Sequence, residues 1–374
     1  MPNGKPPFRA DHVGSLLRPP EVLKAWADRD AGRITPEDSR KVEDEAIRGL
    51  VKLQEDAGLT GITDGECRRK VFHTDFLAQV GGVVVRFGEV TKQFRRSDGT
   101  ELRRAPPKML VTDKLRHTRD IMLDDFKFLK SVTKRTPKVT IPSPSMVHFR
   151  GGRDAIDKTA YPEIPEFFAD LAAVYRAEIA SLANAGLRYL QLDDTNLAYL
   201  CDPEMRESAR HIGEDPDKLP HVYAGLINDS IRDKPDDMVV GVHLCRGNFQ
   251  SAGVASGGYE PVAEALFNEM NVDAYFLEYD DERSGDFRPL RFMPKGKIAV
   301  LGIVSSKIGK LESKDALKRR IDEAAKFMPL EQIAISPQCG FASTSEGNKI
   351  TVAQEKAKLR LCVEVAEEVW GSAV

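Results

Sequence analysis

Eight short apolar runs, each followed by a longer and more polar stretch, recur along this chain of 374 residues. The runs are rich in β-branched residues and nearly continuous in apolar character, as in Ile298–Val304, which is typical of strands buried on both faces. Such runs, alternating with helical stretches, predict a parallel sheet with crossover helices. We place them at residues 9–13, 61–64, 138–141, 189–193, 238–243, 274–278, 298–304 and 332–336. Eight units of this kind predict one α/β domain over residues 1–374, a (β/α)8 or TIM barrel.

The stretches between the runs carry helix-spaced apolar positions or helix-forming composition. The clearest start signal is Thr35-Pro36-Glu37-Asp38, where a capping hydroxyl and a proline at the first helical position precede two acids at the positive end of the helix dipole. We expect helices at residues 35–57, 167–185, 224–231, 261–270, 313–327 and 352–369.

One region departs from this alternation. Residues 83–90 alternate between apolar and polar, the chain turns polar at residues 95–100, and the alternation resumes near residues 108–111. Asp98-Gly99 is a residue pair that two-residue turns between antiparallel strands prefer. We therefore predict a β-hairpin insertion after the second strand, over approximately residues 77–116.

Composition excludes several classes of function. The net charge is −3, from 55 basic and 58 acidic residues spread along the chain, so a nucleic-acid partner is not expected. Residues 1–7 lack the apolar run of a secretory signal, and no stretch approaches the roughly 18 apolar residues of a membrane span. These features predict a cytoplasmic protein without a membrane partner, and they leave a homo-oligomer open.

Three of the expected strands end in residues that bind metals. The catalytic residues of a barrel lie at the carboxyl ends of its strands, and there the sequence has His243 and Cys245, then Glu278, then Cys339. One imidazole, two thiolates and one carboxylate suit a tetrahedral zinc ion. With five scattered cysteines a disulfide framework is not expected. Each of these residues could also be an ordinary core residue, because cysteine is among the most buried residue types.

Six segments together resemble the cobalamin-independent methionine synthase family. They are Asp11-His12-Val13-Gly14-Ser15, Thr63-Asp64-Gly65-Glu66, Gln191-Leu192-Asp193-Asp194, His243-Leu244-Cys245, Glu278 and Gln338-Cys339-Gly340. The resemblance spans essentially the whole chain, as the single zinc-bearing barrel of a family whose longer members have two. It implies a zinc ion held by His243, Cys245, Glu278 and Cys339.

The same resemblance implies where an amino-acid substrate binds. The backbone at Gly14 and Ser15 would hold it, and Glu66 and Asp193 would bind its ammonium group. Either carboxylate could instead pair with a neighbouring base such as Arg68 or Arg69. His12 would lie near the substrate, or it would only form hydrogen bonds within the first strand.

The implied chemistry is the activation of a thiol. A free thiol has a pKa near 8.5 and is mostly protonated at neutral pH, whereas only the thiolate attacks carbon well. Coordination to zinc removes this proton. With a neutral His243 and three ionised ligands the site is anionic, so a bound sulfur keeps its nucleophilicity. Glu278 is the weakest of the four ligands on grounds of softness, and we expect it to leave as the substrate sulfur enters.

Three departures from the family lie on the side of the methyl donor. An indole expected to stack on folate has no counterpart at residues 140–145, a family glutamate is Tyr199, and a proton-donating histidine aligns with Lys307. We therefore name Lys307, with Glu278, as a catalytic candidate and leave the donor open.

The sequence thus predicts a zinc-dependent enzyme of methionine biosynthesis that transfers a methyl group to the thiol of homocysteine. Its partners would be a small-molecule thiol acceptor and a methyl or alkyl donor. Alkyl transfer to another thiol, as in the epoxyalkane–coenzyme M transferases, is one alternative. A zinc-free decarboxylase of the same barrel superfamily is another, and a non-catalytic thiol or zinc carrier is a third.

Overall fold

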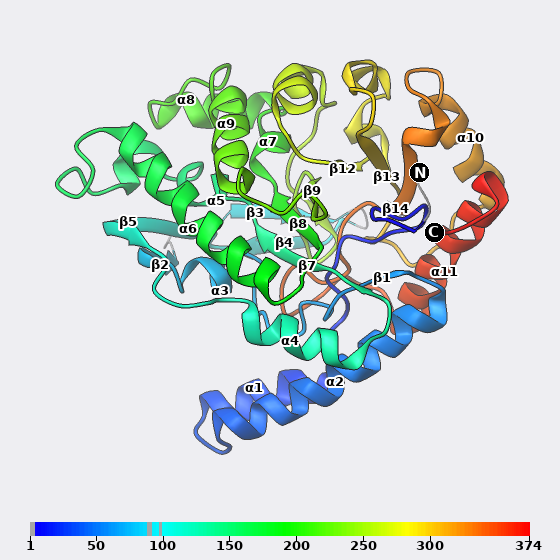
Figure 1. Ribbon diagram of the computed structural model, residues 1–374, viewed down its shortest axis with the longest axis horizontal. Coiled ribbons are helices and arrows are strands. Elements are labelled where there is room, and N and C mark those ends of the chain that lie inside the picture. Colours follow the sequence, from blue (N-terminus) through cyan, green and yellow to red (C-terminus); the bar gives the residue numbers. More distant parts are fainter. Residues whose placement is uncertain (1–3, 88–91, 97–98) are drawn as a thin grey trace.

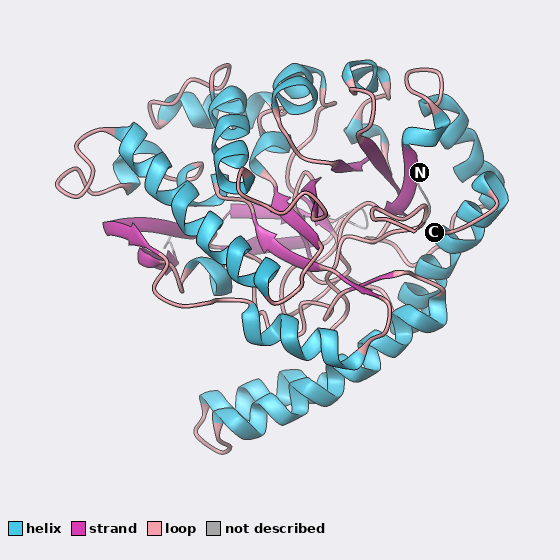
Figure 2. Ribbon diagram, viewed as in Figure 1, coloured by secondary structure: helices cyan, strands magenta, loops and turns pink. Residues whose placement is uncertain are grey.

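The computed structural model describes residues 4–87, 92–96 and 99–374. Its parallel strands lie at the centre of the molecule and its helices pack around them (Figures 1 and 2). Six parallel strands follow each other in the order β14-β13-β12-β9-β8-β7. Their bounds are Val139–Pro142 (β7), Tyr189–Asp194 (β8), Val239–Leu244 (β9), Ala274–Glu278 (β12), Ile298–Val304 (β13) and Ile333–Pro337 (β14).

Two further strand positions close this sheet into a barrel. The short strand β6 (Thr136–Pro137) leads into β7 across one residue, and it pairs in parallel with β1 (Gly61–Ile62). At the other edge Ala10 forms a parallel bridge with Ile335 of β14. The segment around Ala10 also meets the end of β1, because the Leu16 amide donates to the Gly65 carbonyl at 3.0 Å. The prediction of a (β/α)8 barrel is therefore confirmed.

The expected first strand at residues 9–13 is the exception, because it is reduced to the single bridge at Ala10. Side chains take the hydrogen bonds that a strand ladder would otherwise use. Lys138 donates to the His12 carbonyl at 2.6 Å, and Gln191 donates to the Val13 carbonyl at 2.6 Å. The expectation of a regular strand here is wrong, although the segment occupies the strand position.

Eleven helices of the described residues surround or cap the barrel. Their bounds are Pro20–Asp30 (α1), Pro36–Ala57 (α2), Thr74–Leu77 (α3), Leu123–Val132 (α4), Ser145–His148 (α5), Ile164–Asn184 (α6), Asn196–Tyr199 (α7), Pro203–His211 (α8), Leu219–Ile231 (α9), Lys314–Ala324 (α10) and Val352–Trp370 (α11). As predicted, Thr35 caps α2 by accepting a hydrogen bond from the Asp38 amide. None of these helices combines the length and apolar composition that a membrane crossing requires.

The helix expected at residues 261–270 is wrong in type. The structure has a 3-10 turn at Glu260–Val262 and a π-helix at Ala265–Glu269. The buried Tyr275 hydroxyl donates to the Leu266 carbonyl at 2.6 Å. It thereby competes with the amide donors of a regular helix, and inserted groups of this kind are a common cause of helix distortion.

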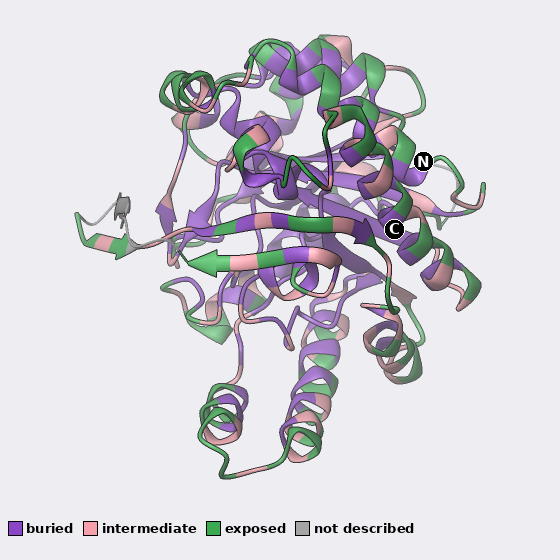
Figure 3. Cartoon of the chain, turned by 90° about the vertical axis from the view of Figure 1, so that its left-hand side faces the viewer, coloured by how far each residue is buried: buried purple, intermediate pink, exposed green. Residues whose placement is uncertain are grey.

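The inserted hairpin is present in the residues that the structure describes. Strand β2 (Gly81–Phe87) pairs in antiparallel fashion with β5 (Pro107–Arg116), and β3 (Lys92–Arg95) pairs with β4 (Glu101–Arg104). Figure 3 shows exposed residues interspersed with buried ones along the long strands of the insertion. Asp98 of the expected turn lies outside the described residues. Arg96 donates to the Gln250 carbonyl at 2.6 Å, which ties the hairpin to the loop of β10 (Asn248–Phe249) and β11 (Ala252–Gly253).

Candidate active site

A cavity of about 290 Å³ opens at the carboxyl ends of the strands, where barrel enzymes have their active sites. The sequence-predicted residues on its wall come from five different strand ends or loops. They are Ser15, Glu66, Asp193, His243, Cys245 and Cys339. The fold therefore brings together residues that are more than 300 positions apart in the chain.

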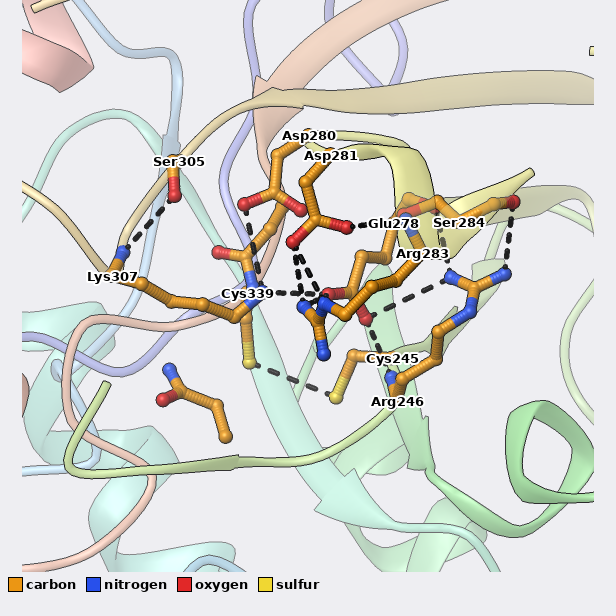
Figure 4. A network of polar contacts seen from close by, with 12 residues as sticks. Cys245, Arg246, Glu278, Asp280, Asp281, Arg283, Ser284, Ser305, Lys307 and Cys339 are labelled. Atoms are coloured by element: carbon orange, nitrogen blue, oxygen red, sulfur yellow. Dashed lines mark hydrogen bonds and ion pairs between the residues drawn. The ribbon is translucent and has the colours of Figure 1, made fainter. Parts of the chain in front are cut away.

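Cys245 and Cys339 face each other at this end of the barrel (Figure 4), with their sulfur atoms 3.7 Å apart. Cys245 follows β9 and Cys339 follows β14. His243, two residues before Cys245, completes a buried group in which one ligand atom of each residue lies within 4.8 Å of the others. The predicted juxtaposition of these three side chains is present.

The geometry and chemistry of this group fit a zinc ion. Two bonds of roughly 2.3 Å that meet at a tetrahedral angle place two sulfur atoms roughly 3.8 Å apart. The observed 3.7 Å agrees with that separation. Two thiols and an imidazole are also the soft and borderline ligands that select zinc over magnesium or calcium.

The lowered pKa of Cys339 favours its thiolate and the raised pKa of His243 indicates negatively charged neighbours, so the group favours a bound cation. Hydrogen bonding from Cys245 lowers the pKa of Cys339 well below its usual range, although burial opposes the shift. Burial alone would lower the pKa of His243, but hydrogen bonds to Asp193 and Cys339 outweigh it and raise the pKa to about 10. The Cys339 sulfur and the Asp193 carboxylate both hydrogen-bond to this imidazole.

Asp193 orients His243. Its Oδ1 atom lies 3.2 Å from His243 Nδ1 and accepts a hydrogen bond of 2.7 Å from Gln191 Nε2. A carboxylate on the second nitrogen of a metal-binding imidazole fixes the orientation of the ring. Both contacts fall on the same oxygen, Oδ1, and Asp193 also lines the cavity.

Glu278 lies beside the thiols but not in the same compact group. Its Oε2 atom accepts a hydrogen bond of 2.6 Å from the Arg246 amide, and its Oε1 atom lies 2.7 Å from Lys307 Nζ. Burial would raise the pKa of Glu278, but the charges of Lys307 and Arg246 outweigh it and lower the pKa to about 2. The role of Glu278 as a metal ligand stays a prediction.

Lys307 points at carboxylates. Its ammonium group lies 2.7 Å from Glu278 Oε1 and 3.5 Å from Asp280 Oδ2 (Figure 4). Lys307 is not among the described residues that line the cavity. The sequence analysis missed Asp280, although a residue two positions beyond Glu278 lies on the same face of an extended chain. The sequence also did not indicate that Arg246 and Arg283 contact Glu278.

Glu66 is a buried carboxylate with one oxygen unpartnered. Thr140 donates to its Oε1 atom at 2.9 Å and Arg69 lies 3.7 Å from that atom, whereas Oε2 has no hydrogen-bond partner. Burial raises the pKa of Glu66 to about 7, against the charge of Arg69 and with that of Asp193. The backbone of Glu66 also has a φ of +53°, a conformation that costs free energy and gathers at functional sites.

The sequence left open that Arg68 or Arg69 pairs with Glu66, and only Arg69 does so. Arg69 is near one oxygen of Glu66, whereas Arg68 pairs with Glu43, Asp44 and Asp125. Neither arginine reaches the second oxygen of Glu66.

The first segment of the chain forms part of the cavity wall through Val13 and Ser15. At Gly14, with a φ of +137°, a Cβ atom would lie 2.7 Å from the Thr140 side chain, so glycine permits the close approach of the chain to Thr140. A Cβ atom at Gly340 would lie 1.8 Å from Ser15 Oγ, so the loop of Cys339 packs directly on Ser15. His12 does not line the cavity, and its Nε2 atom lies 3.2 Å from the Gly61 carbonyl.

The cavity wall also includes mainly apolar residues to which the sequence assigned no role. They include Phe149, Tyr199, Met205, Ala209, Ile212 and Phe249, with Arg150 and Lys108 also on the lining. Phe149 follows the carboxyl end of β7, so the rule that located the thiols could also have located this wall.

Residues 8–368 match the family described as cobalamin-independent synthase, catalytic domain. The chain belongs to this family. The family match makes it an enzyme of the synthase class and confirms the resemblance drawn from the six segments.

Members of the cobalamin-independent synthase family cover this chain almost completely. The uncharacterised Bacillus subtilis protein YxjH is 45% identical over 371 residues, which are 98% of this chain and 96% of that protein. The methionine synthase of Pyrococcus horikoshii is 25% identical over 331 residues, which are 88% of this chain and 84% of that protein. A candidate vitamin-B12-independent methionine synthase from Listeria monocytogenes has a similar crystal structure, with a TM-score of 0.78 and 37% identity over 99% of this chain and all of that one.

Proposed function

We propose that this protein is a zinc-dependent methyltransferase that methylates the thiol of homocysteine. The observation that carries the proposal is a single cavity that joins the group of His243, Cys245 and Cys339 to the unpartnered carboxylate oxygen of Glu66. An acceptor that bears both a thiol and an ammonium group matches the two ends of that arrangement.

The residues of the chain hold the acceptor at both ends. Glu66 Oε2 and Asp193 Oδ2 would accept hydrogen bonds from the ammonium group, in a buried setting where charge-assisted bonds are strong. Ser15 would position the rest of the amino acid. Zinc, held by His243, Cys245 and Cys339, supplies a way to keep the acceptor sulfur deprotonated at neutral pH.

The alternatives fit this site less well. Coenzyme M has a sulfonate and no ammonium group, so it would leave Glu66 Oε2 unpartnered in the buried wall. A zinc-free decarboxylase would have no use for two sulfur atoms 3.7 Å apart beside an oriented imidazole. Both the family and this geometry support methyl transfer to an amino-acid thiol.

The proposal is tested by three measurements on the purified protein. We expect one zinc ion per chain by elemental analysis, and calorimetric binding of homocysteine that is at least about tenfold tighter than that of coenzyme M, the difference that one charge-assisted hydrogen bond supplies. Methionine formation should follow with at least one donor from a panel of methyl-folate, methylcobalamin and S-methyl compounds. Absence of zinc, or equal affinity for the two thiols, would contradict the proposal.

A further inference from the structure

The Glu278 carboxylate is held by cations and amides of the protein itself. Lys307 Nζ lies 2.7 Å from its Oε1 atom, Arg283 Nη2 lies 3.5 Å from the same atom, and the Arg246 amide donates to Oε2 at 2.6 Å. Figure 4 shows Lys307, Arg283 and Arg246 around Glu278, next to Cys245 and Cys339. Both carboxylate oxygens therefore have partners that no metal ion supplies.

The groups that hold Glu278 are themselves fixed. The Arg246 side chain is fully buried, donates to the carbonyls of Gly257 and Ser284, and lies 4.3 Å from the centre of the Tyr259 ring. Lys307 is 8% exposed, and its ammonium group also lies 3.5 Å from Asp280 Oδ2. A buried lysine between two carboxylates has little freedom to leave.

We propose that Lys307 is a positioning residue that holds the Glu278 carboxylate off the group of His243, Cys245 and Cys339. The ligand position that Glu278 would otherwise take is thereby kept for the acceptor thiol. Asp280 shares the Lys307 ammonium group and so weakens its hold on Glu278. This inference rests on the proposed zinc site and assigns Lys307 a role other than proton donor.

The test is Lys307→Met, which keeps the volume of the side chain and removes its charge. Released from Lys307, Glu278 binds the metal more often, so zinc affinity measured by chelator competition should rise about tenfold. The affinity for homocysteine, measured by calorimetry, should fall by about the same factor because the thiol must displace the carboxylate. Lys307→Arg should restore most of both values.

Asp280→Asn provides a second variant with effects of opposite sign. Lys307 then no longer shares its charge with a second carboxylate and holds Glu278 more firmly, so zinc affinity should fall and homocysteine affinity should stay or rise. Lys138→Met is the matched control, because Lys138 is also buried with a carboxylate partner, Asp11, but belongs to the opposite end of the barrel. We expect Lys138→Met to leave the zinc affinity unchanged in the folded protein.

Cobalt substitution gives a readout that requires no methyl donor. Charge-transfer absorption from sulfur to Co²⁺ should grow as homocysteine is added to the wild type, and Lys307→Met should need about tenfold more homocysteine for the same growth. If the wild type binds no metal, the proposed function fails. If the wild type binds metal but neither Lys307→Met nor Asp280→Asn changes the zinc or the homocysteine affinity, only the role of Lys307 is overturned. The same holds if the two variants shift the zinc affinity in the same direction. Should Lys307→Met not fold, Asp280→Asn decides.

Discussion

Buried charges lie at both ends of the barrel interior, and the two groups differ in how completely their atoms are satisfied. At the amino end, the Asp11 carboxylate accepts hydrogen bonds from the Phe8 and His12 amides, from Lys138 at 3.1 Å and from the Tyr189 hydroxyl at 2.7 Å. Packed around it are the apolar residues of the inner barrel. Every oxygen of this carboxylate has a partner within the protein.

At the carboxyl end, the buried carboxylates do not have a hydrogen-bond partner for every oxygen. Glu66 Oε2 has no partner, Asp193 uses one oxygen on His243 and Gln191, and the wall opens into a cavity. An unpaired buried carboxylate oxygen is costly, so its presence indicates a ligand that completes it. The comparison predicts that changes at the amino end alter stability, whereas changes at the carboxyl end alter binding.

The largest effect should follow from Cys339→Ser. Loss of a thiolate from the metal group should weaken zinc binding by more than the roughly 100-fold that outer ligands typically control. The melting temperature of the metal-free protein should change little. Elemental analysis and thermal melts measure the two quantities, and Cys362→Ser serves as control because Cys362 is buried in the core and belongs to no candidate metal-binding group of the described residues. Equal zinc content in both variants would contradict the site.

Lys138→Met tests the amino end. Removal of one partner of a buried ion pair leaves Asp11 uncompensated, which should lower the free energy of unfolding by about 3–5 kcal/mol. Chemical denaturation measures this change. The folded fraction should still bind zinc with wild-type affinity. A stable variant with weakened zinc binding would reverse the roles that we assign to the two ends.

Glu66→Gln should have the intermediate effect. The loss of one charge-assisted hydrogen bond predicts a fall in homocysteine affinity of about 10- to 100-fold, from roughly 1.5–3 kcal/mol. Stability above neutral pH should rise rather than fall, because a buried carboxylate with an unpartnered oxygen is removed. Calorimetry and denaturation of the same sample measure both. A large loss of stability would place Glu66 with the structural charges instead.

The smallest effect concerns pH. Because burial raises the pKa of Glu66 to about 7, its carboxylate gains a proton as pH falls through 7. Homocysteine affinity, taken relative to Glu66→Gln, should therefore fall about tenfold from pH 8 to pH 6. The sign for stability is the reverse: folded Glu66 keeps a proton that the unfolded chain loses between about pH 4.5 and 7, so stability falls as pH rises through that window. If the ratio of the homocysteine affinities of the wild type and Glu66→Gln stays constant from pH 8 to pH 6, Glu66 is excluded as the titrating group.

The barrel and the thiol group were predictable from the sequence because both depend on local rules. Apolar runs of β-branched residues locate the strands, and the residues just beyond those runs meet at one end of a parallel barrel. That rule places His243, Cys245 and Cys339 near one another, and the family resemblance indicates that they form one metal-binding group. Thr35 was equally predictable, since a capping hydroxyl acts on an amide three residues away.

What the sequence could not show depends on contacts between loops. Glu278 ends β12 and Lys307 lies in the loop after β13, and nothing in their spacing indicates that they pair at 2.7 Å. The family resemblance alone suggested Glu278 as a metal ligand and Lys307 as the counterpart of a proton donor, and it did not indicate that the two side chains pair. The irregular first strand was hidden as well, because Lys138 and Gln191, which bond to its carbonyls, are distant in sequence.

The irregular first strand links the closure of the barrel to the acceptor site. Only one bridge, at Ala10, joins this segment to β14, so amide hydrogen exchange in native conditions should be fastest along this seam of the barrel. Gly14 and Ser15 continue the same segment beside Glu66 and Gly340. Transient opening of the seam would therefore dismantle the amino-acid pocket while the sulfur pair stays intact, and a bound acceptor should slow exchange there first.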